Sequence, residues 1–539
     1  MRLKEALSVL SKSSPYSVST LRTGDPDSQL LAKEYLYVRS DIDIEFDDAL
    51  KNSSLGDLLF LCGSSGDGKS EILTRLCRNT DSTSIRFHLD ATHSKTQHGS
   101  AVDCLDNLFD EYEQERFTLA IGINIGMMQK FIKFGADRHR EIKKFLSDFL
   151  EHRHIKGFRS GKASFFDFES YPRIDFSSSC ISSDFVTRFL NNLTRESESN
   201  PFWNAYKEDE QYGLVEAKNY KLLGDTRIQQ AIVELLGLIR LHDEQFLVPR
   251  TFVDFIYKLI VTNHDDGLIG NLFTSLDNEI SEQILSHDPV NVRSEELDDY
   301  FLAKATNTLC PVTVDSLKYL DEFSGLRLSS FGSVRLASIL SETVINEFPG
   351  SYLAKIPSIL SSKSYLELHS IFIKGELSDR DEDTLISVLE ESFINAVLTY
   401  INRAVSKDIN SYVLSRNVKD FFICNKVEIA LDLEAIEEMT HIAPEFLKVP
   451  FIVNETSEVS LDLDIKLLSL VEKIDTGFLP NRNLLNEYAK LDEFIRDIIS
   501  ATSKSEEIKV YRKDDLDILF AEVKKGRRGY TLKGACSVN

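Results

Sequence analysis

The sequence predicts an α/β protein with three parts: a mainly parallel sheet near the N-terminus, a helical module, and a mixed helical and β region. Short apolar runs alternate with amphipathic segments between residues 55 and 200, which is typical of strands and helices around a parallel sheet. Residues 215–345 consist of amphipathic helical segments without glycine-rich strand signals. Residues 346–539 combine further helical segments with short β-like pieces.

Residues 1–54 are expected to form an N-terminal lead-in to the sheet. Within it, Glu34–Val38 (EYLYV) has the composition of a short strand. Asp41–Lys51 (DIDIEFDDALK) has helical spacing and acidic residues in its first turn, where they interact favourably with the helix dipole. We therefore expect a strand and then a helix before the sheet begins.

Four strands and three helices are expected in the α/β part. The run at 57–63 (DLLFLCG) is continuously apolar, as in a strand that is buried on both faces. The expected strands are Asp57–Gly63, Ile85–Asp90, Phe117–Asn124 and Ala163–Tyr171, and the expected helices are Glu71–Asn79, Ser100–Gln114 and Met127–His152. The polar stretch TRESESNP at 194–201 marks the expected end of this part.

The charge balance and the cysteines limit the class of protein. The chain has 62 basic and 86 acidic residues, a net charge of −24, which argues against nucleic-acid binding over the whole surface because phosphate contacts need Lys and Arg. A local basic groove and protein partners remain open. The seven cysteines are dispersed without a CxxC pair, which favours reduced thiols. With neither a signal-like N-terminus nor an 18-residue apolar run, we expect a cytoplasmic protein without membrane contact.

The motif that carries chemistry is GSSGDGKS at 63–70, which matches G-x-x-x-x-G-K-[ST]. The glycines allow a tight turn that directs backbone N–H groups toward phosphate oxygens, and the helix that follows directs its positive dipole end there. We expect Lys69 to reach the β- and γ-phosphates and Ser70 to ligate Mg²⁺. The alternative is a Gly/Ser turn with a solvated lysine; the apolar run before the motif and the amphipathic segment after it favour the P-loop. The expected ATP-binding residues are Gly63, Ser64, Ser65, Gly66, Asp67, Gly68, Lys69, Ser70 and Glu71.

A second acidic element is needed to organise Mg²⁺. Asp90 closes the expected strand IRFHLD, at the carboxyl end where open α/β sheets bind ligands. The alternative is an aspartate that caps its own turn. Ala91 stands where a water-activating glutamate would follow a Walker B aspartate, which places efficient hydrolysis in doubt. The string DNLFDE (Asp106–Glu111) also resembles Walker B, but its periodicity is helical.

Two further polar residues are candidates for a catalytic role. Asn124 ends the strand FTLAIGIN, where a sensor-1 residue orients the attacking water; the alternative is a turn asparagine. Arg250 opens the segment RTFVDFIY after Pro249 and is placed to contact the γ-phosphate as a sensor-2 arginine does; the alternative is an exposed, ion-paired arginine. Arg293 is a weaker candidate for a finger or interface residue.

Other candidate sites carry less weight. The histidines His88, His93 and His98 near Asp90 do not match a zinc spacing. Neither a GxSxG elbow nor a clear Cys/His pair is present. Basic clusters at 138–144, 153–162 and 524–528 are candidate phosphate-backbone contacts, although charge runs are more often solvated faces. Of these, Arg159 and Lys162 flank a glycine loop inside the α/β part.

The helical segments IQQAIVELLGLIRLH and RTFVDFIYKLIVTN follow the α/β part directly. A helical module in this position is the layout of an AAA+-like lid. The complete fold prediction is therefore a P-loop NTPase of AAA+-like type with a parallel-sheet domain at 55–200, a helical lid-like domain at 215–345 and a mixed interaction region at 346–539.

The N-terminal third also resembles a known family. The strings EALSVLSKSSPYSVST, EYLYV, LLFLCGSSGDGKSEILTRL, HLDATHS, GINIGMMQKF and FFDFESYP are similar to those of DptF, the P-loop ATPase subunit of bacterial phosphorothioation-dependent DNA restriction systems. The resemblance is strongest over residues 1 to about 175 and is thinner toward the C-terminus. The extended string around the P-loop, together with SSPYSV, is more distinctive than the P-loop alone.

The resemblance implies an ATPase subunit of an anti-phage complex that acts beside DptG- and DptH-type partners. Such a complex attacks DNA in which no non-bridging phosphate oxygen has been replaced by sulfur. It leaves open whether the chain forms a homo-oligomer and whether it touches DNA directly or through partners. Two alternatives stay open from the residues themselves. One is a nucleotide-bound scaffold with little hydrolysis, motivated by Ala91, and the other is a P-loop phosphotransferase that acts on a small molecule.

Overall fold

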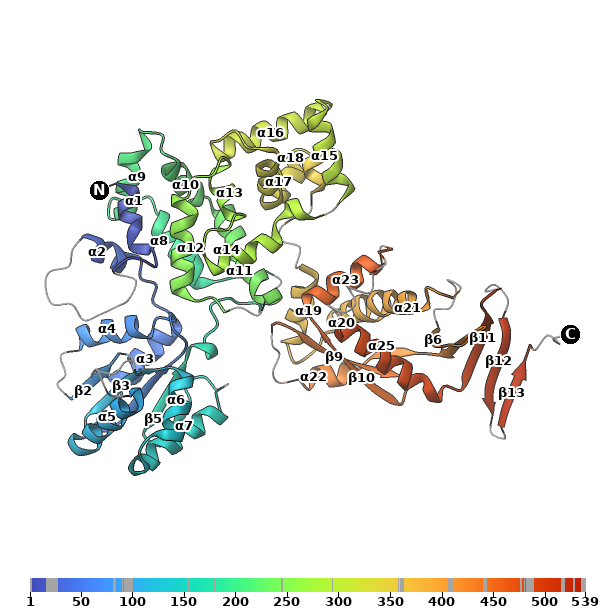
Figure 1. Cartoon of the computed structure of the whole chain (residues 1–539), viewed down its shortest axis with the longest axis horizontal. Coiled ribbons are helices and arrows are strands. Elements are labelled where there is room, and N and C mark those ends of the chain that lie inside the picture. The colour runs from blue at the N-terminus through green and yellow to red at the C-terminus, as the bar shows by residue number, and fades with distance from the viewer. Residues whose placement is uncertain are drawn as a thin grey trace. The chain divides into compact units, whose positions relative to one another are not determined.

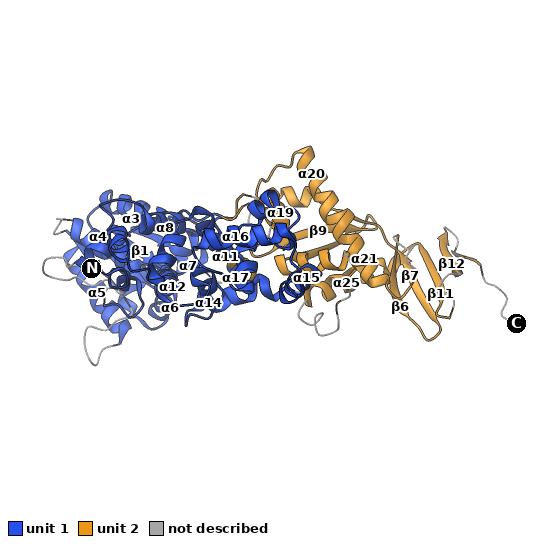
Figure 2. Ribbon diagram, turned by 90° about the horizontal axis from the view of Figure 1, so that it is seen from above, with its two compact units in different colours: residues 1–175, 182–239, 246–360 blue, residues 176–181, 240–245, 361–539 orange. Residues whose placement is uncertain are grey.

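The computed structural model describes residues 2–15, 28–80, 84–89, 91, 100–153, 155–178, 180–243, 246–292, 294–356, 358, 363–405, 411–439, 444–475, 477–478, 480, 489–514, 519–526 and 529–534. The chain divides into two compact units (Figure 2). The first comprises residues 1–175, 182–239 and 246–360, and the second comprises residues 176–181, 240–245 and 361–539. Each unit is described by itself.

A five-stranded sheet forms the α/β part of the first unit (Figure 1). Its strands are β1 (Leu58–Cys62), β2 (Ile85–His88), β3 (Thr118–Ile123), β4 (Arg159–Ser160) and β5 (Ala163–Asp167). The order is β2-β3-β1-β5-β4. All pairs are parallel except β4 with β5. The prediction of a mainly parallel sheet is confirmed, and β1, which precedes the GSSGDGKS loop, lies in its centre.

Helices cover both faces of this sheet. The α/β part and the lead-in contain α1 (Leu3–Leu7), η1 (Ser8–Leu10), α2 (Ser28–Tyr35), α3 (Asp41–Lys51), α4 (Lys69–Asn79), α5 (Ala101–Glu115), α6 (Ile125–Phe134), η2 (Asp137–His139), α7 (Arg140–Glu151) and η3 (Phe168–Ser170). Alternate β1 residues face opposite sides: Phe60 packs in the cluster with α5, α6 and α7, and Leu61 packs in the cluster with α3 and α4. Burial on both faces explains why β1 reads as an unbroken apolar run.

The rest of the first unit is helical, as predicted for residues 215–345. The helices are α8 (Asp184–Thr194), α9 (Pro201–Glu210), α10 (Val215–Leu223), α11 (Thr226–Asp243), α12 (Pro249–Val261), α13 (Gly267–Leu272), α14 (Glu279–Ile284), η4 (Leu285–His287), η5 (Pro289–Asn291), α15 (Glu295–Ala305), α16 (Pro311–Ser324), α17 (Ser330–Ile339), α18 (Ser341–Glu347) and η6 (Tyr352–Lys355). Proline at the first position of α9, α12 and α16 sets their starts, since it lacks the N–H that would be unpaired there.

The lead-in is anchored to these helices. Leu3 is fully buried, and its main-chain N–H donates to Asp209 Oδ2 of α9 at 2.8 Å. Arg2 donates to the other carboxylate oxygen of Asp209 at 2.8 Å. Further along, the Lys12 N–H donates to Asp254 of α12 at 2.7 Å. Residues 2–15 therefore belong to the helical part, while α3 packs on the sheet.

The second unit combines helices with two antiparallel sheets, of order β10-β9-β8 and β13-β12-β11-β7-β6. Its elements are α19 (Lys363–Phe372), α20 (Asp379–Leu385), the π-helix η7 (Ile386–Ile394), α21 (Asn395–Asn402), β6 (Tyr412–Asn417), β7 (Phe421–Lys426), β8 (Ile429–Leu431), α22 (Leu433–Glu437), β9 (Leu447–Val453), β10 (Ser457–Leu463), α23 (Ile465–Asp475), α25 (Ala489–Ala501), η8 (Thr502–Lys504), β11 (Glu507–Arg512), β12 (Leu519–Gly526) and β13 (Gly529–Lys533). The mixed character expected for this region is confirmed.

One helical run has the length and apolar character to cross a membrane. Among the residues that the structure describes, Asp379–Asn402 alone passes this test, with a mean hydropathy of 1.3. The run lies within the second unit, where η7 and α21 both pack against α23. A core helix of this kind has the same composition as a spanning helix.

Two local predictions are wrong. Glu34–Val38 is not a strand: α2 continues to Tyr35, Leu36 lies in a turn, and residues 37–40 have no regular secondary structure. The buried Ala32 and Leu36 lie one helical turn apart, so packing of a helix face overrides the β preference of Tyr and Val. The helix expected over Met127–His152 is two helices, because α6 ends before Gly135 and the 3₁₀ turn η2 precedes α7.

Candidate functional site

The GSSGDGKS loop joins the end of the buried strand β1 to the start of α4 at Lys69. Gly66 and Gly68 have φ angles of +93° and +105°, which glycine adopts at little cost and other residues rarely adopt. Ser64 and Ser65 are exposed, so the outer side of the loop is open to solvent. The two central glycines of the motif are therefore required by the backbone itself.

Two side chains of the loop, Lys69 and Asp67, form hydrogen bonds within it. The Lys69 side chain is 8% exposed, and its Nζ donates to the main-chain oxygens of Gly63 and Ser64 at 2.9 and 2.6 Å. The Ser64 N–H donates to the Asp67 carboxylate at 2.5 Å. These hydrogen bonds hold the Lys69 ammonium group against the loop, at the first residue of α4.

Ser70 directs its hydroxyl toward the end of β2. Its Oγ donates to the Leu89 main-chain oxygen at 3.4 Å, and Leu89 immediately precedes Asp90. Asp90 itself lies outside the described residues, but both of its neighbours are described, and the Ala91 N–H donates to the Gly122 oxygen of β3 at 2.9 Å. The Ser70 hydroxyl thus reaches the end of β2 at Leu89, at the carboxyl end of the sheet.

Asn124 follows β3 and lies beside the start of the loop, because the Gly63 N–H donates to the Ile123 oxygen at 3.3 Å. Its Oδ1 accepts the Met127 N–H at 2.7 Å and caps α6. The turn role weighed for this asparagine is therefore present. Its Nδ2 group donates no hydrogen bond to the described parts of the chain, so it remains available as a donor.

The start of α12 approaches the loop from the helical part. A Cβ built on Gly66 lies 2.8 Å from Val248 Cγ1 and 3.5 Å from Arg250 Cβ. Arg250 is exposed, and it forms neither a hydrogen bond nor an ion pair with any residue the structure describes. These contacts do not support the alternative in which Arg250 is held in an ion pair. Glu71, in the first turn of α4, pairs with Lys33 of α2 at 2.6 Å.

Arg173 is a residue of this site that the sequence did not single out. Its Nη2 donates to the Asp67 main-chain oxygen at 2.8 Å and its Nη1 to the Leu247 oxygen at 3.5 Å, so it joins the loop to the segment that leads into α12. Burial lowers the pKa of Arg173 to about 10. Burial also raises the pKa of Asp67, against the opposing effect of Arg173.

An ion pair between the half-buried Arg153 and the buried Asp167 supports the other side of the loop. Asp167 ends β5 beside Cys62 of β1, is 2% exposed, and accepts from Arg153 at 2.8 and 2.9 Å. The next residue, Phe168, lies against the loop: a Cβ built on Gly63 lies 2.8 Å from its ring. Arg153 was expected only as part of a basic cluster; here it holds the end of the neighbouring strand.

Some members of each basic cluster are paired with acids. Arg138 forms two hydrogen bonds with Asp110 at 2.6 and 2.7 Å, and Lys524 lies 3.2 Å from Glu507. Arg159 and Lys162 are exposed and flank the turn between β4 and β5. Arg527 and Arg528 lie outside the described residues, as do Arg293, His93 and His98. Within the described ranges, three or more His, Cys, Asp or Glu side chains do not gather as a metal site would require.

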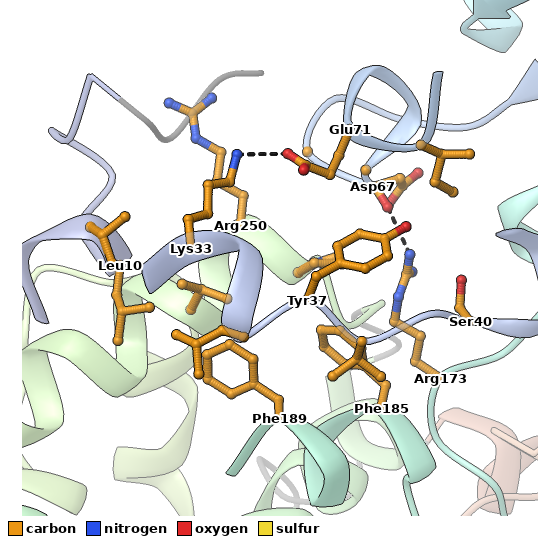
Figure 3. A pocket seen from close by; sticks show the side chains of 18 of the residues that line it. Leu10, Lys33, Tyr37, Ser40, Asp67, Glu71, Arg173, Phe185, Phe189 and Arg250 are labelled. Carbon is orange, nitrogen blue, oxygen red and sulfur yellow. Dashed lines mark hydrogen bonds and ion pairs between the residues drawn. The ribbon is translucent and has the colours of Figure 1, made fainter. Parts of the chain in front are cut away.

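A cavity of about 210 Å³ opens beside the loop (Figure 3). Three parts of the first unit line it: residues 9–12 and 33–40 of the lead-in, residues 66–72 of the loop and α4, and residues 249–253 at the start of α12. Phe168, Arg173, Phe185 and Phe189 complete the wall. Sequence reasoning missed this cavity, because its walls come from four distant stretches of the chain.

Comparison of the chain with protein-family models, with curated proteins and with solved structures found no match. The loop and its neighbours place one lysine, one hydroxyl and several backbone N–H groups at the carboxyl end of a parallel sheet, where open α/β sheets bind ligands.

Proposed function

We propose that this chain is a P-loop ATPase that binds ATP with Mg²⁺ on residues 63–71. The observation that supports this most is the loop itself. Two glycines in the left-handed region stand directly before a helix that begins at Lys69, and the loop follows the central strand of a parallel sheet. Backbone N–H groups in such a turn, with the positive end of the helix dipole behind them, form an anion site suited to phosphate.

The residues present fit a triphosphate and its metal. Lys69 would exchange its contacts with Gly63 and Ser64 for the β- and γ-phosphate oxygens, which are stronger acceptors because they are charged. Ser70 and Asp90 would hold Mg²⁺, which prefers oxygen ligands and neutralises phosphate charge when bound. The hydrogen bond of Ser70 to Leu89, the neighbour of Asp90, supports this pairing.

Hydrolysis needs groups that orient water and stabilise charge on the γ-phosphate. The Asn124 amide is available beside the loop, and the Arg250 guanidinium lacks a partner in the described structure, so both suit the sensor roles predicted from sequence. The helical part that carries Arg250 would then act as an AAA+-like lid, and γ-phosphate contacts would bias its position as in other nucleotide switches. Ala91 at the position after Asp90 favours slow turnover.

At the cellular level, we propose that the chain is a DptF-type subunit of a phosphorothioation-dependent DNA restriction complex. The support is the resemblance of residues 1 to about 175, which includes the loop and the lead-in. DptG- and DptH-type proteins would be its partners, in the cytoplasm and without a membrane. DNA contact, direct or through those partners, and self-assembly belong to the same proposal.

The test is steady-state ATP hydrolysis by the purified chain, with and without double-stranded DNA. We expect turnover that Lys69→Ala abolishes and that the matched control Lys130→Ala, on the exposed surface of α6, leaves unchanged. Stimulation by DNA would support the restriction role. Turnover that persists in Lys69→Ala would refute hydrolysis at this loop.

A nucleotide-bound scaffold is the second candidate, and Ala91 is the observation that favours it. ATP bound by the wild-type chain without turnover, alone and with its partner subunits, would support the scaffold. Turnover that disappears in Asp90→Ala and Asn124→Ala, while ATP binding persists, would exclude it.

A further inference from the structure

The second unit contains a groove of about 720 Å³ between a helical run and an edge strand. The helical side comes from η7 and α21, and the strand side comes from β8 and from the turn between β9 and β10. All of these elements lie in residues 361–539 (orange in Figure 2), so none of them belongs to the P-loop. η7 is a π-helix, a form that is rare and is found frequently at functional sites.

The groove combines apolar side chains with carboxylates. Ile394, Leu398 and Val427 line it and are buried. Lysine, arginine and histidine are absent from the part of the lining that the structure describes, whereas four carboxylates are present. These belong to Glu390, Glu391, Glu428 and Glu455. The groove is therefore apolar inside and negatively charged.

Two of the four carboxylates lack a partner. Glu428 pairs with Lys426 at 2.6 Å, and Glu390 accepts a main-chain hydrogen bond from β8. Glu391 and Glu455 are exposed, and their side chains form neither a hydrogen bond nor an ion pair with any residue that the structure describes. Complementary charge selects binding partners, so this groove favours a basic segment and repels nucleic acid, whose phosphates are negative.

The main chain of β8 is open toward the groove. β8 pairs with β9 at the end of its sheet. The Asp432 N–H donates to the Pro450 oxygen of β9 at 3.1 Å, so alternate residues of this strand turn their main-chain groups away from β9. The Leu431 N–H accordingly donates to Glu390, in the groove lining, at 3.1 Å. Ile429 lies two residues earlier and also lines the groove, so its N–H and C=O face the same open edge.

A strained residue presents one of the free carboxylates. The turn between β9 and β10 is closed by the Thr456 N–H, which donates to the Val453 oxygen at 3.3 Å. Its central residues, Asn454 and Glu455, have φ angles of +50° and +60°. Such turns favour Asn-Gly, and a side chain in the glycine position adds strain. Strained residues cluster at functional sites, and Glu455 directs no contact into the described fold that would offset its strain.

We propose that this groove binds an extended, basic segment of a partner protein, which adds a strand to the edge of β8. The N–H and C=O of Ile429 pair with the main chain of the segment, as in other cases of strand addition to a sheet edge. Lysine or arginine side chains of the segment pair with Glu391 and Glu455. Glu390 already holds the Leu431 N–H and so marks the end of the pairing. This binding does not depend on ATP, because every residue of the groove lies in the second unit.

The first test selects random twelve-residue peptides, displayed on phage, on the full-length wild-type chain. The selection is preceded by counter-selection on the double variant Glu391→Lys/Glu455→Lys. We expect enrichment of sequences in which lysine or arginine alternates with apolar residues, since successive side chains of a strand point to opposite faces. Failure to enrich basic sequences over the starting library would overturn the proposal, and this is also the result expected if a segment of the same chain fills the groove.

The second test measures the affinity of the most enriched peptide, labelled with fluorescein, for single variants of the chain. Glu391→Lys and Glu455→Lys should each bind it about tenfold more weakly, because like charges then face each other. Asp462→Lys is the matched control: Asp462 is an exposed residue of β10 outside the groove lining, and this variant should bind as wild type does. Equal affinity in all three variants would overturn the proposal.

Glu455→Gly separates binding from folding. Glycine adopts a positive φ angle without strain, so the urea midpoint of this variant should equal or exceed that of wild type. Its peptide affinity should fall about threefold, as expected for the loss of one exposed ion pair. A lower urea midpoint with unchanged peptide affinity would show that Glu455 serves the turn alone and would overturn its role in binding.

Strand addition has its own signature in the peptide. Methylation of one main-chain nitrogen at a time should weaken binding at every second position, because alternate N–H groups of the added strand face β8. Equal effects at all positions would refute strand addition. Sedimentation of the wild-type chain alone tests the other occupant: self-association that disappears in Glu391→Lys/Glu455→Lys would assign the groove to a second copy of the chain and overturn the partner segment.

Discussion

Substituting the two loop glycines one at a time separates backbone strain from packing against α12. Gly66 and Gly68 have similar positive φ angles, +93° and +105°, so alanine at either position costs about 1–2 kcal/mol of strain. A Cβ at Gly68 meets open space, whereas a Cβ at Gly66 lies 2.8 Å from Val248 Cγ1. Because valine has few rotamers, overpacking adds about 1–3 kcal/mol at Gly66 alone.

The free energy of unfolding should therefore fall by about 1–2 kcal/mol in Gly68→Ala and by about 2–5 kcal/mol in Gly66→Ala. Trp203 on α9 is the only tryptophan of the chain and lies in the first compact unit, so its fluorescence follows urea unfolding of that unit. Gly56→Ala, at φ +91° with open space around its Cβ, gives a second measure of strain alone. If all three variants lose the same stability, the contact between the loop and the start of α12 is refuted.

Two further perturbations test the anchors of the two units. Asp209→Ala should destabilise the first unit by about 1–3 kcal/mol in the same fluorescence assay, because it leaves the buried Leu3 N–H unpaired; an unchanged urea midpoint would mean that the lead-in is not anchored there. In the second unit, the hydroxyl of Tyr412 is the largest cause that holds the pKa of Glu507 at about 2, and Glu522 and then Lys524 lower it further. This carboxylate therefore adds stability above its unfolded pKa of about 4.3, and that stability is lost as the pH falls toward 2. Tyr412→Phe should therefore lower stability by about 1 kcal/mol at pH 7 and by less at pH 3 in urea titrations followed by circular dichroism, and an equal loss at both pH values would contradict this account.

Local signals in the sequence were sufficient for the centre of the site. An unbroken apolar run, a glycine-rich turn and an amphipathic segment in succession predict β1, the loop and α4, because each depends on neighbours within a few residues. The same reasoning failed at Glu34–Val38. There, the aromatic and β-branched composition favoured a strand, but packing of Ala32 and Leu36 in the fold decides for a helix.

The remainder of the site depends on contacts between distant segments. Arg173 reaches the Asp67 oxygen across 106 positions of sequence, and Asp167 lies beside the loop only because β5 is the neighbour of β1 in the sheet. Local periodicity does not contain the strand order, so neither residue could be identified from its own surroundings.

The central claim is that residues 63–71 bind the phosphates of ATP. It is tested most directly by calorimetric titration of Mg·ATP into the wild-type chain and into Lys69→Ala, with Lys130→Ala as the control. Charged hydrogen bonds to phosphate contribute about 1.5–3 kcal/mol, so we predict that Lys69→Ala binds ATP at least tenfold more weakly and that the control binds as wild type does. Equal binding by all three proteins would contradict the account.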